Sequence, residues 1–493
     1  ITLGVMHPDL RVRLARLLFM LKKDDELLGE ELPAVTAANM GELAALHYMR
    51  GKSLSRRDWV DESRDEFLTA LRFYDTAQAT GKVSGESLAL RRELWLLQES
   101  NEDLKAASQH VTCRVKLKSA KLPRYDVPDR VSARVLKVGP NEQYRRPSDA
   151  AAVAKDGDII EIAPGRYEND PVVWRQNRLI LRAQSKDRDA RPHMVAGAVL
   201  ADEKAIWTFY GNNIIVDSIE FSGAENRHNN GAGIRFEGVS LAVLNSYFHH
   251  NQNGILTRGR PRSKVHVEFS EFGHNGAGDG YSHNIYVGKE DRLVFRYNYS
   301  HHAKVGHLLK SRAKENDIRS NRFSDEEEGL TSYLVDLPDA GLASIVGNVF
   351  FQSFRPQNET LISYGAESVM SPSMLNMVNN TAYNQSVGGV LVHNHTNLAV
   401  IIANNLFFGT NGLLNEGLAR LASNMVAPLA RVRDFETFDF RLRADSRLID
   451  KGSEYPVRGS LSLVAESEYV HPANATPRAK AWKPDIGAYE YCR

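Results

Sequence analysis

The pattern of apolar and polar positions divides the chain into two parts. From about residue 10 to residue 110, apolar side chains recur at helical spacing, and Leu14 and Leu18, for example, would share one helix face. Three later segments of this region repeat the pattern, with charged residues between the apolar ones. The pattern predicts an α-helical domain over residues 1–115, followed by a linker over residues 116–135.

After Lys137 the helical period disappears, and short runs of β-branched and aromatic residues alternate with Asn, Gly and Asp. One phrase recurs at intervals of 24–32 residues and closes on Phe221, Phe248, Phe272, Tyr299, Phe323, Phe350, Ala382 and Leu406. One three-strand coil of a β-helix needs about this length, whereas a β-propeller blade needs about 40 residues. We therefore expect a mainly β fold, a right-handed single-stranded parallel β-helix over residues 136–425, closed by residues 426–493.

Each expected coil has corners and a second strand whose faces can be assigned. Asn321, Asn348, Asn380 and Asn404 stand at turn positions and suit left-handed corners. Alternation along the second strand predicts two columns, with one residue from each coil. The inward column is Ile285, Leu309, Val335, Ile362 and Val392, and the outward column is Tyr286, Lys310, Asp336, Ser363 and His393.

Composition and charge exclude several classes of function. The formal net charge of +1 and the pI near 7.9 give no global field for nucleic acid or an anionic membrane. Apolar runs such as residues 17–21 are far shorter than a membrane span of roughly 20 residues.

Nothing after Ile1 has the pattern of a signal peptide, so we expect one to be absent or removed. Cys113 and Cys492 could form one disulfide or stay reduced, and no pattern specifies the oligomeric state.

The densest group of chemically active side chains lies within residues 281–313. It comprises His283, His301, His302, His307, Lys304, Lys310 and Arg312. Cleavage of a uronic acid polymer by β-elimination needs a cation at the sugar carboxylate, a base and an acid. We hypothesise a polysaccharide lyase with Lys310 as base, Arg312 as carboxylate neutraliser and His307 or Tyr286 as acid. Further contacts to an acidic polysaccharide are expected from His283, Asn284, His302, Asp336, Tyr364 and His393.

Other interpretations of these residues stay open. Lys310 could form a structural ion pair with Asp336, and His301 and His302 could cap a turn, as His249 and His250 could. A uronate C5-epimerase would share the first step. A glycoside hydrolase would need outward carboxylates, for which Asp336, Asp339 and Glu367 are candidates. The remaining alternative is a non-catalytic carbohydrate-binding or surface scaffold protein.

The sequence predicts no resident metal or cofactor. Its histidines lack the closely spaced arrangement of a typical zinc site. The acidic run at residues 325–328 could offer oxygen ligands to calcium, or it could form an exposed loop. Calcium is therefore the one ion kept as an alternative.

Several segments resemble a known superfamily over residues 135–493. The run that begins VGPNEQYRRPSDAAAVAKDGDIIEIAPGRY at Val138 resembles the opening coil of bacterial secreted right-handed β-helix proteins of the pectate-lyase-like superfamily. The runs SHNIYVG, GHLLKSRA, SYLVDLPDAG and LISYGAE are similar to one subgroup, and DFRLRADSRLIDKGS with PDIGAYEY is similar to its closing segment. The resemblance implies a secreted or periplasmic protein with a polysaccharide ligand.

A narrower resemblance concerns the expected base. Lys310-Ser311, with Asn316 and Asn321 after it, is similar to the Lys-Ser segment of β-helix lyases of the alginate lyase and chondroitinase B type. That resemblance implies that the lysine is the base. This chain departs from the pattern where those lyases hold calcium, because Ala303 and Val305 replace the carboxylates. Asp336 stands near the position of their arginine, so Arg312 or His307 would have to replace it.

Overall fold

The computed structural model describes most of the chain after residue 121. The described residues are 46, 47, 49, 50, 70, 122–326, 328–386, 388–409, 412–426, 432–434, 438–454, 461–479 and 483–491. The chain divides into two compact units, residues 1–109 with 427–431, and residues 110–426 with 432–493. The five described residues of the first unit are helical, but the predicted helical domain otherwise lies outside the described residues, as do Cys113 and Cys492. Within the described part, no helix is long and apolar enough to cross a membrane.

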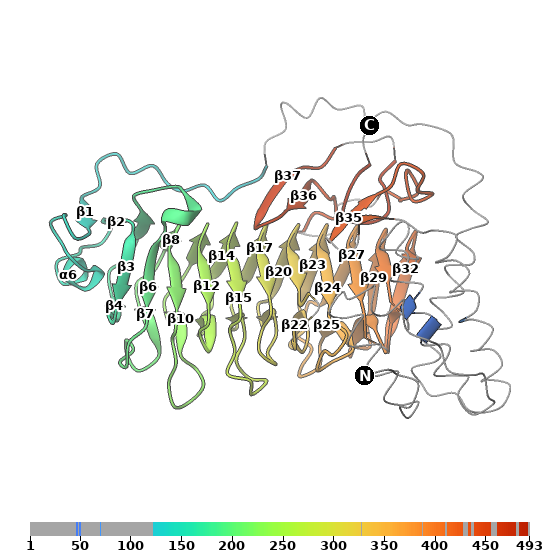
Figure 1. The fold of residues 1–493 in the computed structure, drawn as a ribbon, viewed down its shortest axis with the longest axis horizontal. Coiled ribbons are helices and arrows are strands. Elements are labelled where there is room, and N and C mark those ends of the chain that lie inside the picture. The colour runs from blue at the N-terminus through green and yellow to red at the C-terminus, as the bar shows by residue number, and fades with distance from the viewer. Residues whose placement is uncertain are drawn as a thin grey trace, which may run out of the picture. The chain divides into compact units, whose positions relative to one another are not determined.

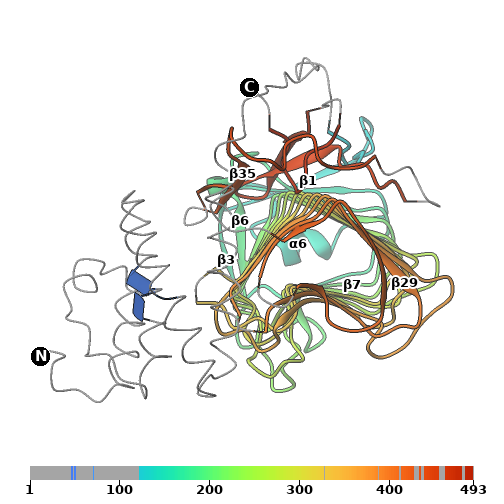
Figure 2. The ribbon, with the colours of Figure 1, turned by 90° about the vertical axis from the view of Figure 1, so that its right-hand side faces the viewer.

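Three long parallel sheets form the second unit (Figures 1 and 2), and the strands are distributed as follows. Sheet A contains β1 (Val135–Val138), β2 (Ile159–Ile162), β5 (Ile180–Ala183), β8 (Ile214–Asp217), β11 (Leu241–Leu244), β14 (Lys264–Glu268), β17 (Arg292–Arg296), β20 (Glu315–Arg319), β23 (Leu342–Val346), β26 (Met374–Val378), β29 (Ala399–Ala403) and β32 (Leu418–Ala422). Sheet B contains β3 (Gly165–Glu168), β6 (Pro192–Val195), β9 (Glu220–Ser222), β12 (Tyr247–His249), β15 (Glu271–Gly273), β18 (Tyr299–His301), β21 (Arg322–Ser324), β24 (Val349–Gln352), β27 (Thr381–Asn384), β30 (Leu406–Phe408) and β33 (Met425–Val426). Sheet C contains β4 (Val172–Trp174), β7 (Ala205–Phe209), β10 (Ala232–Phe236), β13 (Asn253–Thr257), β16 (Ile285–Val287), β19 (Leu309–Ser311), β22 (Val335–Leu337), β25 (Thr360–Tyr364), β28 (Val390–Asn394) and β31 (Gly412–Leu414).

From β2 to β33 the chain visits sheets A, B and C in turn, and every pairing between successive coils is parallel. Figure 2, which looks along the coil, shows the three walls around a common interior. The predicted parallel β-helix is therefore confirmed. Its right-handed sense stays a prediction.

An aromatic stack fills the interior, and it corrects part of the predicted repeat. Phe221, Phe248 and Phe272 stack with ring centroids 5.0 and 5.1 Å apart. In the next coil Ser300, not Tyr299, is paired with Phe272, and Phe295 of sheet A fills the space beside it, 6.1 Å from the Phe272 ring. The prediction for Leu406 is wrong by one residue in the same way, because the register there pairs Ala382 with Phe407. Sequence spacing alone did not show where each coil begins.

The corner between sheets A and B is built by an internal ladder of asparagines. Each member after the first accepts hydrogen bonds at Oδ1 from the backbone and side chain of the member in the preceding coil. The ladder comprises Asn298, Asn321, Asn348, Asn380, Asn405 and Asn424. The left-handed residue is the one before each ladder position, as at Asn379 (φ 53°) and Asn404 (φ 55°). The predicted left-handed corners at Asn321, Asn348 and Asn380 are therefore wrong by one residue, and Asn404 is correct.

Short elements cover one end and one wall of the coil. The helix α6 (Pro147–Ala151) packs against β1, β2 and β4, with Pro147 and Ala150 buried. A short 3-10 turn, η3, spans Arg188–Ala190. After β33 come two antiparallel pairs, β34 (Val432–Asp434) with β35 (Asp439–Leu442), and β36 (Ser467–Val470) with β37 (Asn474–Pro477).

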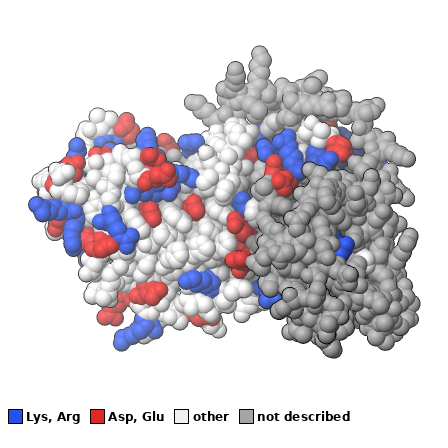
Figure 3. Space-filling model, viewed as in Figure 1, with Lys and Arg blue, Asp and Glu red and all other residues white. Residues whose placement is uncertain are grey.

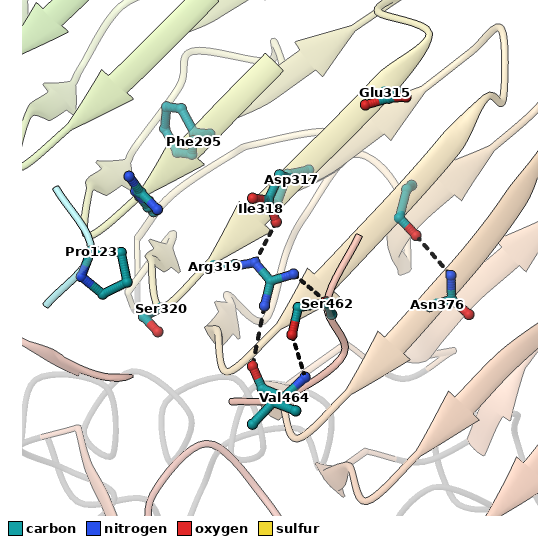
Figure 4. Close-up of polar contacts among 12 residues, drawn as sticks. Pro123, Phe295, Glu315, Asp317, Ile318, Arg319, Ser320, Asn376, Ser462 and Val464 are labelled. Carbon is teal, nitrogen blue, oxygen red and sulfur yellow. Dashed lines mark hydrogen bonds and ion pairs between the residues drawn. The ribbon is translucent and has the colours of Figure 1, made fainter. Parts of the chain in front are cut away.

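The C-terminal strands lie over the outer face of sheet A and over part of sheet B (Figures 1 and 2). Arg319 of β20 donates hydrogen bonds to the backbone carbonyls of Ser462 and, at 3.2 Å, of Val464, and it also binds Asp317 (Figure 4). Ser320 Oγ lies 2.8 Å from Ser467 Oγ. The segment also packs on sheet B, because the Phe438 ring lies 4.9 Å from Phe351 of β24 and the Phe440 ring lies 6.5 Å from Phe408 of β30. The closing segment thus covers sheet A and part of sheet B, while the outer face of sheet C and the rest of sheet B carry the remaining polar columns.

Candidate functional site

The predicted outward column exists on sheet C. Its register pairs Tyr286 with Lys310, Lys310 with Asp336, Asp336 with Ser363 and Ser363 with His393. The predicted inward column, Ile285, Leu309, Val335, Ile362 and Val392, is fully buried. Because successive coils lie about 4.8 Å apart, the outward side chains of neighbouring coils can contact each other directly.

Lys310 and Asp336 form the centre of the site. Lys310 Nζ lies 2.8 Å from Asp336 Oδ2 and 3.4 Å from Glu367 Oε1. The Lys310 side chain is only 13% exposed. An ion pair this shielded from water is screened less than a surface pair, so Asp336 and Glu367 hold the ammonium group in a defined place.

A neutral imidazole supports this ion pair from one side. His307 Nε2 lies 3.4 Å from Asp336 Oδ2, and its Nδ1 accepts the backbone N–H of Tyr333 at 3.1 Å. Nδ1 is therefore unprotonated, and Nε2 carries the proton that faces Asp336. Burial lowers the pKa of His307 to about 4, although the nearby Asp336 carboxylate opposes this shift.

A second buried imidazole lies under the first. The rings of His283 and His307 are stacked with centroids 4.7 Å apart, and His283 Nδ1 accepts the backbone N–H of His307 at 3.1 Å. Burial also lowers the pKa of His283 well below its usual range, and His307, Lys310 and Arg312 add to the effect. Both imidazoles are therefore neutral near neutral pH, and they form a rigid support beneath the charged groups.

Arg312 connects the column to residues from two further coils. Its Nε donates to the Tyr286 hydroxyl oxygen at 2.8 Å, and its two terminal nitrogens donate to Asp339 at 2.7 Å and to Glu367 at 2.5 Å. Burial disfavours the guanidinium charge, but the hydrogen bonds to Glu367 and Tyr286 raise the pKa of Arg312. Because the Tyr286 oxygen accepts from Arg312, its own hydroxyl proton points elsewhere and stays available to a ligand.

Glu367 bridges the two cations. Its carboxylate contacts both Lys310 and Arg312, yet its side chain is 51% exposed. Those two contacts lower the pKa of Glu367 against the opposing effect of burial. Glu367 therefore places an exposed carboxylate at a position where a lysine and an arginine converge.

Four of the predicted contact residues lie away from this group. Asn284 is fully buried and binds the Ser300 side chain and the His301 carbonyl, and Tyr364 is fully buried with its hydroxyl donated to the Gly341 carbonyl. Neither reaches a ligand at the surface in this structure. His302 belongs to a histidine group at the edge of sheet B, 4.9 Å from the His274 ring.

The fourth of these, His393, lies two coils beyond Asp336 in the same column. Its ring stacks on His395 at 3.6 Å and lies 3.2 Å from Glu416. The structure thus brings together Tyr286, Lys310, Arg312, His307, His283 and Asp336, and it separates the other four. Tyr333, which fixes the tautomer of His307, was missed, because its contribution is a backbone N–H and no sequence pattern identifies it.

A cleft of about 230 Å³ separates sheet A from the closing segment, and Arg292, Arg296, Asp317 and Arg319 contribute to its walls. Arg296 binds Glu268, and Arg292 lies 3.8 Å from Asp317. These charges pair within the wall and with the closing segment, so this cleft serves to attach that segment. On the face of the described β-helix in Figure 3, basic and acidic residues lie side by side and do not gather in a patch of one sign.

Comparison with known proteins gives two structural likenesses. No protein-family model matches the chain. No curated protein matches it either. A crystal structure of pectate lyase Pel9A is 16% identical, with a TM-score of 0.49, over 72% of this chain and 96% of that chain. A crystal structure of the pectin methylesterase from Aspergillus niger is 12% identical, with a TM-score of 0.31, over 62% of this chain and 88% of that chain. At these values neither likeness assigns an activity to this chain.

Proposed function

We propose that the outer wall of sheet C binds an acidic polysaccharide and cleaves it by β-elimination, as a uronate polysaccharide lyase. The observation that carries this proposal is the exposed Glu367 carboxylate, which lies between Lys310 and Arg312. A sugar carboxylate has the same charge and geometry. It can replace Glu367 at these two cations without any change in the buried part of the site.

The neighbouring groups supply the other requirements of the reaction. With the sugar carboxylate on Arg312, the negative charge that develops on it during proton removal is stabilised by the guanidinium group. The Lys310 ammonium group first releases a proton to solvent. The resulting amine then takes the C5 proton, and Asp336 at 2.8 Å stabilises the ammonium group that forms again. A double bond forms between C4 and C5 while the bond from C4 to the glycosidic oxygen breaks. The Tyr286 hydroxyl donates its proton to that leaving oxygen.

His307 is a positioning residue in this scheme. Its neutral ring is fixed by Tyr333 and holds Asp336 beside Lys310. Because it is buried and both ring nitrogens face protein groups, it does not need to contact the sugar. The acid role therefore goes to Tyr286.

Hydrolysis is the second candidate, and one observation favours it. Asp336, Asp339 and Glu367 all gather around Lys310 and Arg312. A glycosidase needs two carboxylic groups on either side of the scissile bond, one as acid and one as base or nucleophile. The products separate the two reactions, because only elimination gives an unsaturated uronate.

The test is an assay of the full chain on a panel of uronic acid polymers that follows the ultraviolet absorbance of the unsaturated product. We expect activity on at least one polymer, and Lys310→Ala should lower it by about 10²–10⁴-fold, the usual contribution of a general base. The matched control is Lys314→Ala, which removes an exposed lysine of the same coil that pairs with Asp291. Circular dichroism of each variant checks the fold.

Each alternative outcome would indicate a different function. Proton exchange at C5 without cleavage would indicate an epimerase, and new reducing ends without unsaturation would indicate the hydrolase. Binding that is equal in the parent and in Lys310→Ala, with no reaction on any polymer, would leave a carbohydrate-binding protein and refute the lyase.

A further inference from the structure

The outer wall of sheet B carries imidazole and carboxylate groups that the proposed reaction does not use. His249 and His301 occupy equivalent positions two coils apart, with Gly273 between them. Each ring reaches back to a glutamate of the preceding coil. His249 Nε2 lies 2.9 Å from Glu220 Oε1, and His301 Nε2 lies 3.4 Å from Glu271 Oε1.

The next residue in three successive coils is also a histidine. His250, His274 and His302 have left-handed backbones with φ of 53°, 57° and 47°. This shared conformation directs their side chains alike, and the rings stack along the coil with centroids 5.2 Å and 4.9 Å apart. The corner of sheet B is therefore a continuous row of imidazoles.

Three of these imidazoles converge on one point. His274, His301 and His302 each offer a ring nitrogen, and these nitrogens lie within 4.8 Å of one another. His301 Nδ1 and His302 Nδ1 are 2.8 Å apart. A zinc ion with bonds of ~2.0–2.1 Å holds its nitrogen ligands within about 4 Å of each other. Small rotations of the His274 and His302 rings, which are partly exposed, are sufficient to reach this spacing around the buried His301 ring.

The coil between the two histidine pairs is shaped to accept the His301 ring. A Cβ atom on Gly273 would lie 2.3 Å from His301 Cε1, so any other residue there would displace the imidazole. Within the described part of the chain, the ring nitrogens of His301 have no hydrogen bond to a backbone group. The turn-capping role considered for His301 in the sequence is therefore not how its ring is used.

The protonation states suit a metal ligand. Glu271 faces Nε2 of His301, which leaves the Nδ1 lone pair directed at His302. Neutral imidazole is the form that binds metal, and a carboxylate on the far ring nitrogen is the usual support for such a ligand.

We propose that His274, His301 and His302 bind one divalent transition-metal ion of the zinc class, with Glu271 as the group that orients His301. Three nitrogen ligands leave a coordination position open to solvent or to a ligand. The site lies on sheet B, and it is independent of the reaction proposed for sheet C.

The test is calorimetric titration of the chelator-treated full chain with zinc, together with cobalt, whose visible spectrum reports tetrahedral coordination. We expect saturable binding of one ion per chain. His274→Asn and His302→Asn should each weaken binding by at least tenfold, and asparagine is chosen because it tolerates the left-handed backbone at both positions. Glu271→Gln should weaken binding by about 10–100-fold, as is typical for a group that supports a metal ligand.

The matched control is His249→Ala, which removes the equivalent histidine two coils earlier and should leave the affinity unchanged. It also addresses the neighbouring group of His193, Glu220 and His249. If zinc does not bind, if both asparagine variants bind as the parent does, or if His249→Ala abolishes binding, the proposed site is refuted. Thermal melts of every variant without zinc distinguish a lost ligand from a lost fold.

Discussion

The walls of sheets B and C are built on the same coils, yet they carry different chemistry. On sheet C, two cations, Lys310 and Arg312, form ion pairs with Asp336, Asp339 and Glu367 of later coils. On sheet B, His193, Glu220, Tyr247 and Glu271 form one column, and His249 and His301 lie beside its two glutamates. The backbone spacing is the same in both walls, so the side chains alone decide what each wall can bind.

The difference shows how a parallel coil can hold two sites at once. Charged groups on sheet C attract a charged polymer and can exchange their present partners for it, because Glu367 is exposed. Imidazoles on sheet B offer ring-nitrogen lone pairs, which suits a metal ion.

The largest expected difference between the two walls comes from removing one tyrosine hydroxyl group from each. We expect Tyr286→Phe to lower the cleavage rate by about 10²–10⁴-fold, because the leaving oxygen loses its proton donor. Tyr247→Phe on sheet B removes the same atom from a partly buried tyrosine and should leave the rate unchanged. Initial rates on the polymer that the parent cleaves fastest provide the measurement. Equal rates for the parent and Tyr286→Phe would remove Tyr286 from the reaction.

A second prediction concerns the imidazole beneath the ion pair of sheet C. The folded pKa of His307, about 4, lies below its ordinary value of 6.5. Between these values the unfolded chain binds a proton that the folded chain does not, so acid destabilises the fold. Protonation of His307 should therefore lower the free energy of unfolding by about 3 kcal/mol as the pH falls from 6.5 to 4, because each pH unit contributes about 1.4 kcal/mol.

Denaturant unfolding across this pH range measures that effect. His307→Asn keeps an acceptor for the Tyr333 N–H but cannot titrate, so its stability should fall less steeply with acid than that of the parent. The control is His228→Asn, which replaces an exposed loop histidine and should leave the slope as it is. Parallel slopes for the parent and His307→Asn would mean that His307 is not held neutral.

The sequence predicted the outward column of sheet C because alternation in a strand leaves only two faces. Tyr286, Lys310 and Asp336 follow from the pattern in three short strands, and the register places them in adjacent coils as expected. Periodic signals do not mark where a coil starts, so Tyr299 was aligned in place of Ser300. The interior shows why: Phe295 from another sheet fills that position, which no repeat within sheet B could indicate.

Residues on loops and groups formed between coils were harder to predict. Glu367 follows β25 in a loop without a period, and the sequence suggested it only as a hydrolase carboxylate. The histidine group on sheet B forms only if His250, His274 and His302 occupy equivalent positions in successive coils. Because these coils differ in length, even spacing in the sequence does not reveal that alignment. The repeated His-His pairs at residues 249–250 and 301–302 were the available signal, and the intervening Gly273-His274 has meaning only in three dimensions.

The smallest expected effect tests the role of Glu367 as a built-in competitor. If its carboxylate occupies the position of a sugar carboxylate, Glu367→Gln should bind a uronate oligosaccharide about fivefold more tightly, since an exposed ion pair contributes up to about 1 kcal/mol. Calorimetric titration of an oligomer that the parent binds provides the measurement. Glu416→Gln removes an equal charge from the same wall at His393, away from Lys310 and Arg312, and controls for the general field. Weaker binding by Glu367→Gln would mean that Glu367 positions the cations for the polymer and does not compete with it. An equal increase in affinity in Glu367→Gln and Glu416→Gln would mean that the change in net charge alone causes the effect.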